Sequence, residues 1–132
     1  MGAVLVAIVL IICIAVVIKS SKKASGSKMA DIKKQMTENA KSIEADFNRV
    51  GWSAWGYPVH LLDDQIQRMH RASTSEKMEL IGYDDSLCIA RVRGDSGTEY
   101  RIDKQGCSCP DFAKRGLPCK HMYFAVGVLT DN

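Results

Sequence analysis

Three cysteines and one histidine lie close together near the carboxyl end of this chain, and they constrain its fold more than any other feature. The stretch CSCPDFAKRGLPCKH contains Cys107, Cys109, Cys119 and His121. Three thiolates and an imidazole match a four-coordinate zinc site, and four protein ligands leave no position for a catalytic water. The sequence therefore predicts one structural Zn²⁺ ion held by these four residues.

The spacing of these residues also predicts the local backbone. Residues two apart on a helix point about 200° away from each other, so Cys119 and His121 cannot both face one ion from the middle of a helix. We expect Cys119 in the loop before a helix and His121 in its first turn. Cys107 and Cys109 are expected in a bent knuckle, which the neighbouring glycine and proline permit.

The segment before this cluster has the period-two alternation of β-strands. Residues 77–83, 87–93 and 98–104 alternate, with turn residues between them, and predict three short antiparallel strands joined by hairpins. Cys88 is expected on the apolar face of the second strand, filling core volume. The predicted class is α+β: an N-terminal transmembrane helix, amphipathic helices, and a small antiparallel sheet with a helix.

The stretch CSCPDFAKRGLPCKHMYFAV resembles the SWIM zinc finger, whose pattern is Cys-x-Cys, a variable gap and Cys-x-His on a strand–strand–helix fold. The proline, aspartate and phenylalanine at 110–112 and the proline at 118 also match residues that this family often carries. The resemblance covers roughly residues 77 to 130. It implies the same four ligands and a role in binding DNA or protein.

The chain begins with an apolar run, residues 2–18, that has no charged side chain. As a helix it is roughly 25 Å long, the short end of what a bilayer core requires, and it predicts a transmembrane helix. Residues 19–28 form a basic juxtamembrane linker, so membrane lipid is expected to contact residues 2–28. The lysines follow the run, which predicts an outside N-terminus and a cytoplasmic zinc module. A cleaved signal peptide is the alternative, since residues 24–27 offer small side chains.

The middle of the chain, residues 29–72, predicts a helical region. Apolar residues recur every three or four positions from Met29 to Val50, so this stretch forms either a coiled coil or a helix packed on its own chain or on a membrane partner. Residues 51–60 break the pattern, and residues 61–72 predict a short helix. His60 and His70 are expected to be structural or solvent-facing. Residues 73–132 form the zinc module.

The expected function is a membrane-anchored zinc module that binds an unidentified protein partner, without a small-molecule substrate. No general base accompanies a cysteine apart from the histidine assigned to the metal, so no enzyme activity is expected. The alternative is nucleic-acid binding through basic side chains of the module: Arg91, Arg93, Arg101, Lys114, Arg115 and Lys120. Residues 72–132 hold 8 basic and 9 acidic side chains, so strong DNA binding is not expected.

Overall fold

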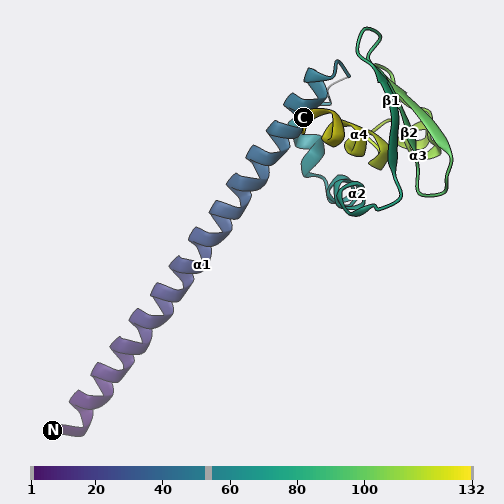
Figure 1. Ribbon diagram of the computed structural model, residues 1–132. Coiled ribbons are helices and arrows are strands. Elements are labelled where there is room, and N and C mark those ends of the chain that lie inside the picture. The colour runs from purple at the N-terminus through teal and green to yellow at the C-terminus, as the bar shows by residue number, and fades with distance from the viewer. Residues whose placement is uncertain (1, 53–54, 132) are drawn as a thin grey trace. The chain divides into compact units, whose positions relative to one another are not determined.

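A computed structural model describes residues 2–52 and 55–131, with side chains from residue 26 onward. The chain divides into two compact units, Met1–Met36 and Thr37–Asn132, which are described separately. Figure 1 shows the elements in chain order: α1 (Gly2–Arg49), the 3-10 helix η1 (Tyr57–Leu61), α2 (Asp63–Thr74), β1 (Glu79–Asp84), β2 (Ile89–Arg93), β3 (Glu99–Asp103), β4 (Gly106–Cys107), α3 (Pro110–Arg115) and α4 (Lys120–Thr130). The α+β class is confirmed.

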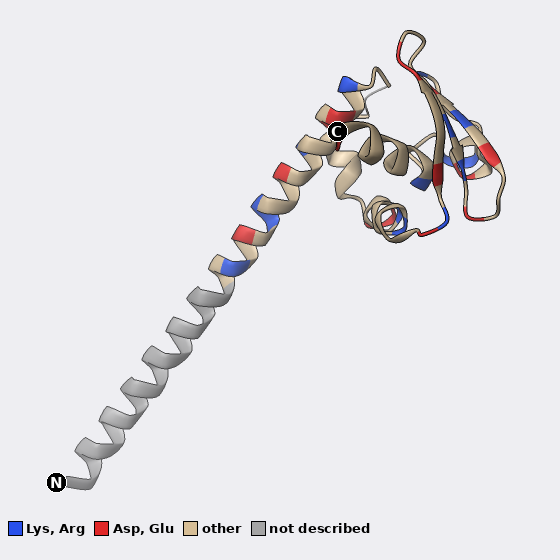
Figure 2. Cartoon of the chain, viewed as in Figure 1, with Lys and Arg blue, Asp and Glu red and all other residues tan. Residues whose placement is uncertain are grey.

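The prediction of a transmembrane helix is wrong for the part of the chain that the structure describes. No helix there is both long enough and apolar enough to cross a bilayer. The physical reason is charge: the described stretch of α1 carries lysines and acids along its length, which a bilayer core does not accept (Figure 2). The predicted single-pass localisation, with an outside N-terminus and a cytoplasmic module, is corrected on the same finding. The apolar run at 2–18 lies outside the residues whose side chains are described.

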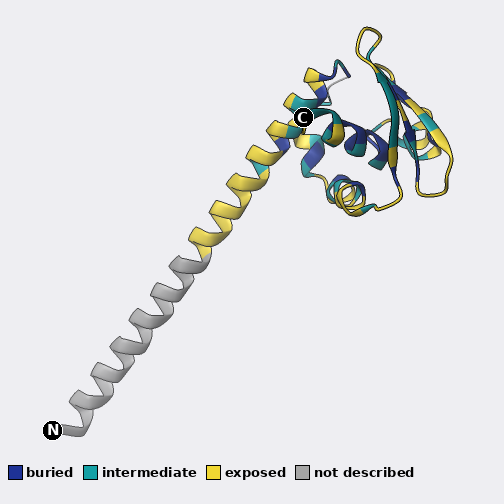
Figure 3. Cartoon of the chain, in the orientation of Figure 1, coloured by how far each residue is buried: buried dark blue, intermediate teal, exposed yellow. Residues whose placement is uncertain are grey.

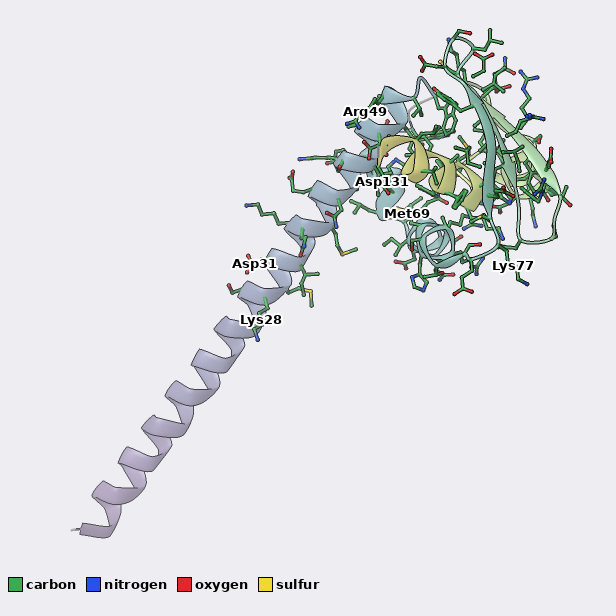
Figure 4. All side chains as sticks on the ribbon, viewed as in Figure 1. Lys28, Asp31, Arg49, Met69, Lys77 and Asp131 are labelled. Carbon is green, nitrogen blue, oxygen red and sulfur yellow. The ribbon has the colours of Figure 1, made fainter. Side chains whose placement is uncertain are left out.

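The first unit contains α1 as far as Met36. The helix runs without a break through residues 19–28, where the sequence predicts a linker. Lys28 and Asp31 project from it in Figure 4. The apolar side chains Met29, Ile32 and Met36 are 67%, 53% and 42% exposed. The coiled-coil alternative for this stretch stays a prediction.

The second unit is built on an antiparallel sheet in the order β1-β2-β3-β4. Its inner face is formed by pairs such as Ala90 opposite Ile102 and Ile102 opposite Cys107. A bulge between Leu80 and Gly82 interrupts the pairing of β1 with β2. The three predicted strands are confirmed as β1, β2 and β3, and β4 is a further short strand.

Helix α4 packs against β2 and β4 of this sheet, and α2 packs against α4. Much of α4 is buried, as Figure 3 shows, including Met122 and Ala125, which are fully buried. The end of α1 completes the core: Phe47 is fully buried, and its ring lies 5.6 Å from that of Tyr123. The apolar stripe of α1 after residue 36 thus packs on the chain's own core.

Cys88 does not lie where the alternation predicts. It precedes β2 in the turn, with a positive φ of 54°, and it is only partly buried at the edge of the core. The Cys88 Sγ lies close to Gly51, and a Cβ on that glycine would be only 2.8 Å from this sulfur. The prediction of a core position on the strand is therefore wrong, because the turn extends two residues further than the pattern indicates.

Candidate metal centre

The first of the four clustered side chains is delivered by a tight hairpin. Strand β4 pairs with β3, which sets Cys107 opposite Ile102 on the buried face of the sheet. Gly106 has a φ of 136°, and a Cβ there would collide with the ring of Phe112. Only glycine permits both the backbone conformation and the close approach of that ring. The hairpin can therefore bring Cys107 into the core.

The second and third cysteines are each the N-cap of a helix. Cys109 precedes α3, and its Sγ accepts a hydrogen bond from the Phe112 N–H at 3.4 Å. Cys119 precedes α4, and its carbonyl accepts a hydrogen bond from the Met122 N–H at 3.1 Å. Both residues have the extended backbone of an N-cap, so each sulfur lies at the N-terminal end of the helix that follows. The expectation that Cys119 precedes a helix with His121 in its first turn is confirmed.

These elements bring all four predicted side chains together. The ligand atoms of Cys107, Cys109, Cys119 and His121 lie within 4.8 Å of one another, and all four residues are buried. The Cys119 Sγ and the His121 Nδ1 are 3.8 Å apart. Zinc–sulfur bonds of about 2.3 Å place the corners of a tetrahedron about 3.8 Å apart. Both the donor set and its spacing therefore fit a zinc ion.

The imidazole of His121 is held in one orientation by its neighbours. Its Nδ1 lies on the side of the Cys119 sulfur, while its Nε2 lies 3.0 Å from the position that a Cβ on Gly94 would occupy. The ring of Tyr100 covers it at a centroid distance of 4.4 Å and an angle of 35°. The ring therefore presents Nδ1, and not Nε2, to the cysteine sulfurs.

Crowding of the three sulfurs shifts their protonation. Hydrogen bonds from Cys107 and Cys119 lower the pKa of the Cys109 thiol. The pKa of Cys107 is raised to about 12 by its hydrogen bond to Cys109. The pKa of Cys119 is raised by hydrogen bonds to the other two sulfurs. Cys109 therefore gives up its proton most readily of the three, while Cys107 and Cys119 hold theirs. A divalent cation would displace those protons and stabilise all three thiolates.

The basic residues predicted for nucleic-acid binding are mostly held by acidic partners. Among the six, four form ion pairs: Arg93 with Glu79 and Glu99, Arg101 with Asp103, Arg115 with Asp111, and Lys120 with Asp95. Arg91 and Lys114 are exposed and form no ion pair within the described residues. Arg91 and Arg101 lie opposite each other on β2 and β3, yet four of the six stand beside acidic partners, which lower the positive charge of the surface.

Two of the structure's contributions to the site have no clear sequence signal. Gln65 is fully buried on α2, more than forty residues from the ligands, and its Nε2 donates to the Pro118 carbonyl at 3.0 Å. Tyr100, on β3, covers the His121 ring in a tilted arrangement. One signal was readable: Asp111 and Arg115 stand four residues apart on a short helix, a spacing at which opposite charges pair.

A small sheet and two capped helices that bury three cysteines and a histidine fit the zinc-finger class of module. Comparison with family models matches residues 90–129 to the SWIM zinc finger. The matched segment begins in β2 and ends in α4, so α1, α2 and β1 lie outside it. Comparisons with curated proteins and with solved structures give no match. The family match and the cluster together point to a zinc-binding site.

Proposed function

We propose that this chain is a zinc-stabilised interaction module that binds a protein partner. The observation that carries the proposal is the buried cluster of Cys107, Cys109, Cys119 and His121, whose ligand atoms lie within 4.8 Å of one another. In the proposed site these four side chains bind one Zn²⁺ ion. They fill a tetrahedral coordination sphere, so the proposed role of the metal is structural and not catalytic.

Substitution of ligands tests the proposed metal site. Cys109→Ala and His121→Ala are each expected to lose zinc, measured by elemental analysis, and to lose the fold, measured by circular dichroism. Cys88→Ala is the matched control, because this thiol lies in a turn outside the cluster. It should keep the zinc of the unsubstituted chain. Retention of full zinc by both ligand variants would rule out the proposed site.

The charge arrangement favours a protein over a nucleic acid as the partner. DNA affinity grows with the number of phosphates that basic side chains neutralise. Carboxylates beside those side chains repel phosphates and reduce this gain. Arg91 and Lys114 are the two candidates that form no ion pair within the described residues. Two such contacts are too few for strong binding at physiological salt.

A second observation supports the protein reading. A groove of about 430 Å³ lies between the end of α1, α2 and α4, and its walls include Ile43, Met69 and Phe124. Two aspartates, Asp46 and Asp131, stand among its lining residues. Figure 4 labels Met69 on α2 and Asp131 immediately after the end of α4. Apolar walls suit the side chains of a protein, whereas carboxylates repel phosphates.

A salt titration separates the two partner classes. Fluorescent duplex and single-stranded DNA are titrated with the full chain from low salt to about 0.15 M salt. We expect weak binding that salt abolishes. A DNA dissociation constant below about 1 μM that persists at 0.15 M salt would instead point to a nucleic-acid partner, provided that the tight binding is lost in an Arg91→Glu/Lys114→Glu variant.

A further inference from the structure

A buried polar cluster outside the four metal-ligand candidates connects the two ends of the site. Gln65 donates from Nε2 to the Pro118 carbonyl at 3.0 Å and to the Tyr123 hydroxyl at 3.2 Å. Its Oε1 accepts from Arg115 Nη1 at 3.0 Å. Because the guanidinium only donates and the carbonyl only accepts, the orientation of this fully buried amide is fixed.

Arg115 extends the cluster to the other side of the site. Its Nε and Nη2 donate to the two carboxylate oxygens of Asp111, both at 2.9 Å, and Nη2 also reaches the Pro118 carbonyl at 3.4 Å. Arg68 on α2 donates to the same carboxylate at 2.9 and 3.1 Å. The Asp111 carboxylate is thus held between two guanidiniums, one from α3 and one from α2.

The groups that this cluster binds stand next to the ligand candidates in the sequence. Asp111 comes two residues after Cys109, and Pro118 immediately precedes Cys119. The Arg115 and Gln65 side chains therefore bind to both ends of the segment that separates the first ligand pair from the second. These contacts join the two ends of the segment, so they help to set the spacing of the four ligands. Without them the metal alone would have to order the segment, which would cost conformational entropy and weaken affinity.

We propose that Arg115 and Gln65 are positioning residues of the zinc site, which set the separation of the Cys107/Cys109 pair from the Cys119/His121 pair. This inference rests on the zinc site proposed above. Arg115 is thereby assigned a role in holding the ligand loop, and Gln65 acts on the site from α2, outside the segment that matches the SWIM zinc finger. Neither side chain binds the metal itself.

The test compares two conservative arginine substitutions in the full chain. Arg115→Lys keeps the charge but loses the two-pronged contact with Asp111 and the bond to Gln65. Arg93→Lys is the matched control, because Arg93 also binds two acidic partners, Glu79 on β1 and Glu99 on β3, and neither partner belongs to the segment between the ligand pairs. Zinc dissociation constants are measured by competition with a chromophoric chelator. Arg115→Lys should bind zinc about tenfold more weakly, and Arg93→Lys within about twofold of the unsubstituted chain.

A spectroscopic readout separates positioning from a general loss of stability. Co²⁺ in the site reports ligand geometry through its ligand-field bands, which should shift in Arg115→Lys and stay unchanged in Arg93→Lys. If Arg115→Lys does not fold, Gln65→Glu replaces it. That variant keeps an acceptor for Arg115 but loses the donor to Pro118, and the same tenfold loss is expected.

The outcomes distinguish this inference from the proposed site. Failure of the unsubstituted chain to bind zinc would overturn both. Zinc binding by the unsubstituted chain, with affinity and Co²⁺ bands unchanged in Arg115→Lys, or in Gln65→Glu where that variant is used, would overturn only the assignment of positioning residues. A weakening of equal size in Arg93→Lys would also overturn it, since the effect would then be one of overall stability.

Discussion

At the scale of single residues, Gly94 is the glycine on which the metal site depends most directly. A Cβ there would lie 3.0 Å from His121 Nε2 and 3.0 Å from the Tyr100 ring, closer than ordinary contact. Gly94→Ala should therefore push the imidazole and lower zinc affinity by about tenfold, measured by chelator competition.

Another glycine provides the control for this substitution. Gly127 lies inside α4, and a Cβ there would have nothing within 4 Å. Gly127→Ala should leave zinc affinity unchanged and raise the free energy of unfolding by about 0.5–1 kcal/mol, because alanine is the better helix former. Equal zinc affinities in the two variants would show that His121 does not need its packed orientation.

The protonation of the cysteines predicts how zinc affinity depends on pH. The pKa values of Cys107 and Cys119 are raised by their hydrogen bonds to the neighbouring sulfurs, so near neutral pH these two sulfurs keep their protons until a cation binds. Zinc binding then releases about two protons, and affinity should fall about a hundredfold for each pH unit of acidification. Competition titrations between about pH 6 and 8 measure this slope. A slope near zero would contradict the assignment.

At the scale of elements, a chain of hydrogen bonds joins the helices around the site. The Tyr123 hydroxyl accepts from Gln65 and lies 2.7 Å from His60 Nδ1, and His60 Nε2 lies 2.9 Å from Glu44 on α1. His60 Nε2 donates to the Glu44 carboxylate, because an ionised carboxylate only accepts. The expectation of a structural histidine holds for His60, which is buried.

Removal of this hydroxyl should destabilise the fold. Tyr123→Phe leaves His60 and Gln65 each with an unpaired group in the core, and the free energy of unfolding should fall by about 1–3 kcal/mol in chemical denaturation. Tyr57→Phe is the control, because Tyr57 is 38% exposed. It should change stability by less than about 0.5 kcal/mol. Equal free energies of unfolding for both variants would show that this series of hydrogen bonds contributes no net stability.

The end of α1 is predicted to be an integral part of the zinc module. Phe47 is fully buried, and its ring packs against the rings of Trp52, Trp55, His60 and Tyr123. Phe47→Ala should lower the free energy of unfolding by about 3–5 kcal/mol. Met36→Ala on the same helix should change it by less than about 0.5 kcal/mol, because Met36 is 42% exposed. Thermal or denaturant unfolding of the two variants measures this, and similar losses would contradict the packing.

At the scale of the whole molecule, the sequence predicts the local elements well and the long-range contacts poorly. The period-two stretches and the Cys-x-Cys and Cys-x-His spacings identify the strands and the four clustered side chains, because those patterns depend on local geometry. Gln65 is different: nothing in its neighbourhood indicates that a buried amide on α2 bonds to the Pro118 carbonyl. Such contacts follow from tertiary packing, which periodicity does not encode.

The charge of the sequence is likewise a poor predictor of the binding partner. A count of basic side chains suggests a surface for nucleic acid, yet Arg93 lies between Glu79 and Glu99, and Arg115 binds Asp111. Figure 2 shows basic and acidic residues interspersed along the strands. The first of these pairings depends on strand register, which is set by the whole sheet. The net charge of +3 therefore gives little information about the partner of the module.

X-ray absorption at the zinc edge tests the central claim most directly, because it counts the atoms that bind the metal. The full chain is loaded with one equivalent of zinc. We predict three sulfur atoms at about 2.3 Å and one nitrogen at about 2.0–2.1 Å, the shell of Cys107, Cys109, Cys119 and His121. A shell of oxygen or nitrogen atoms without sulfur, or a chain that retains no zinc, would contradict the account.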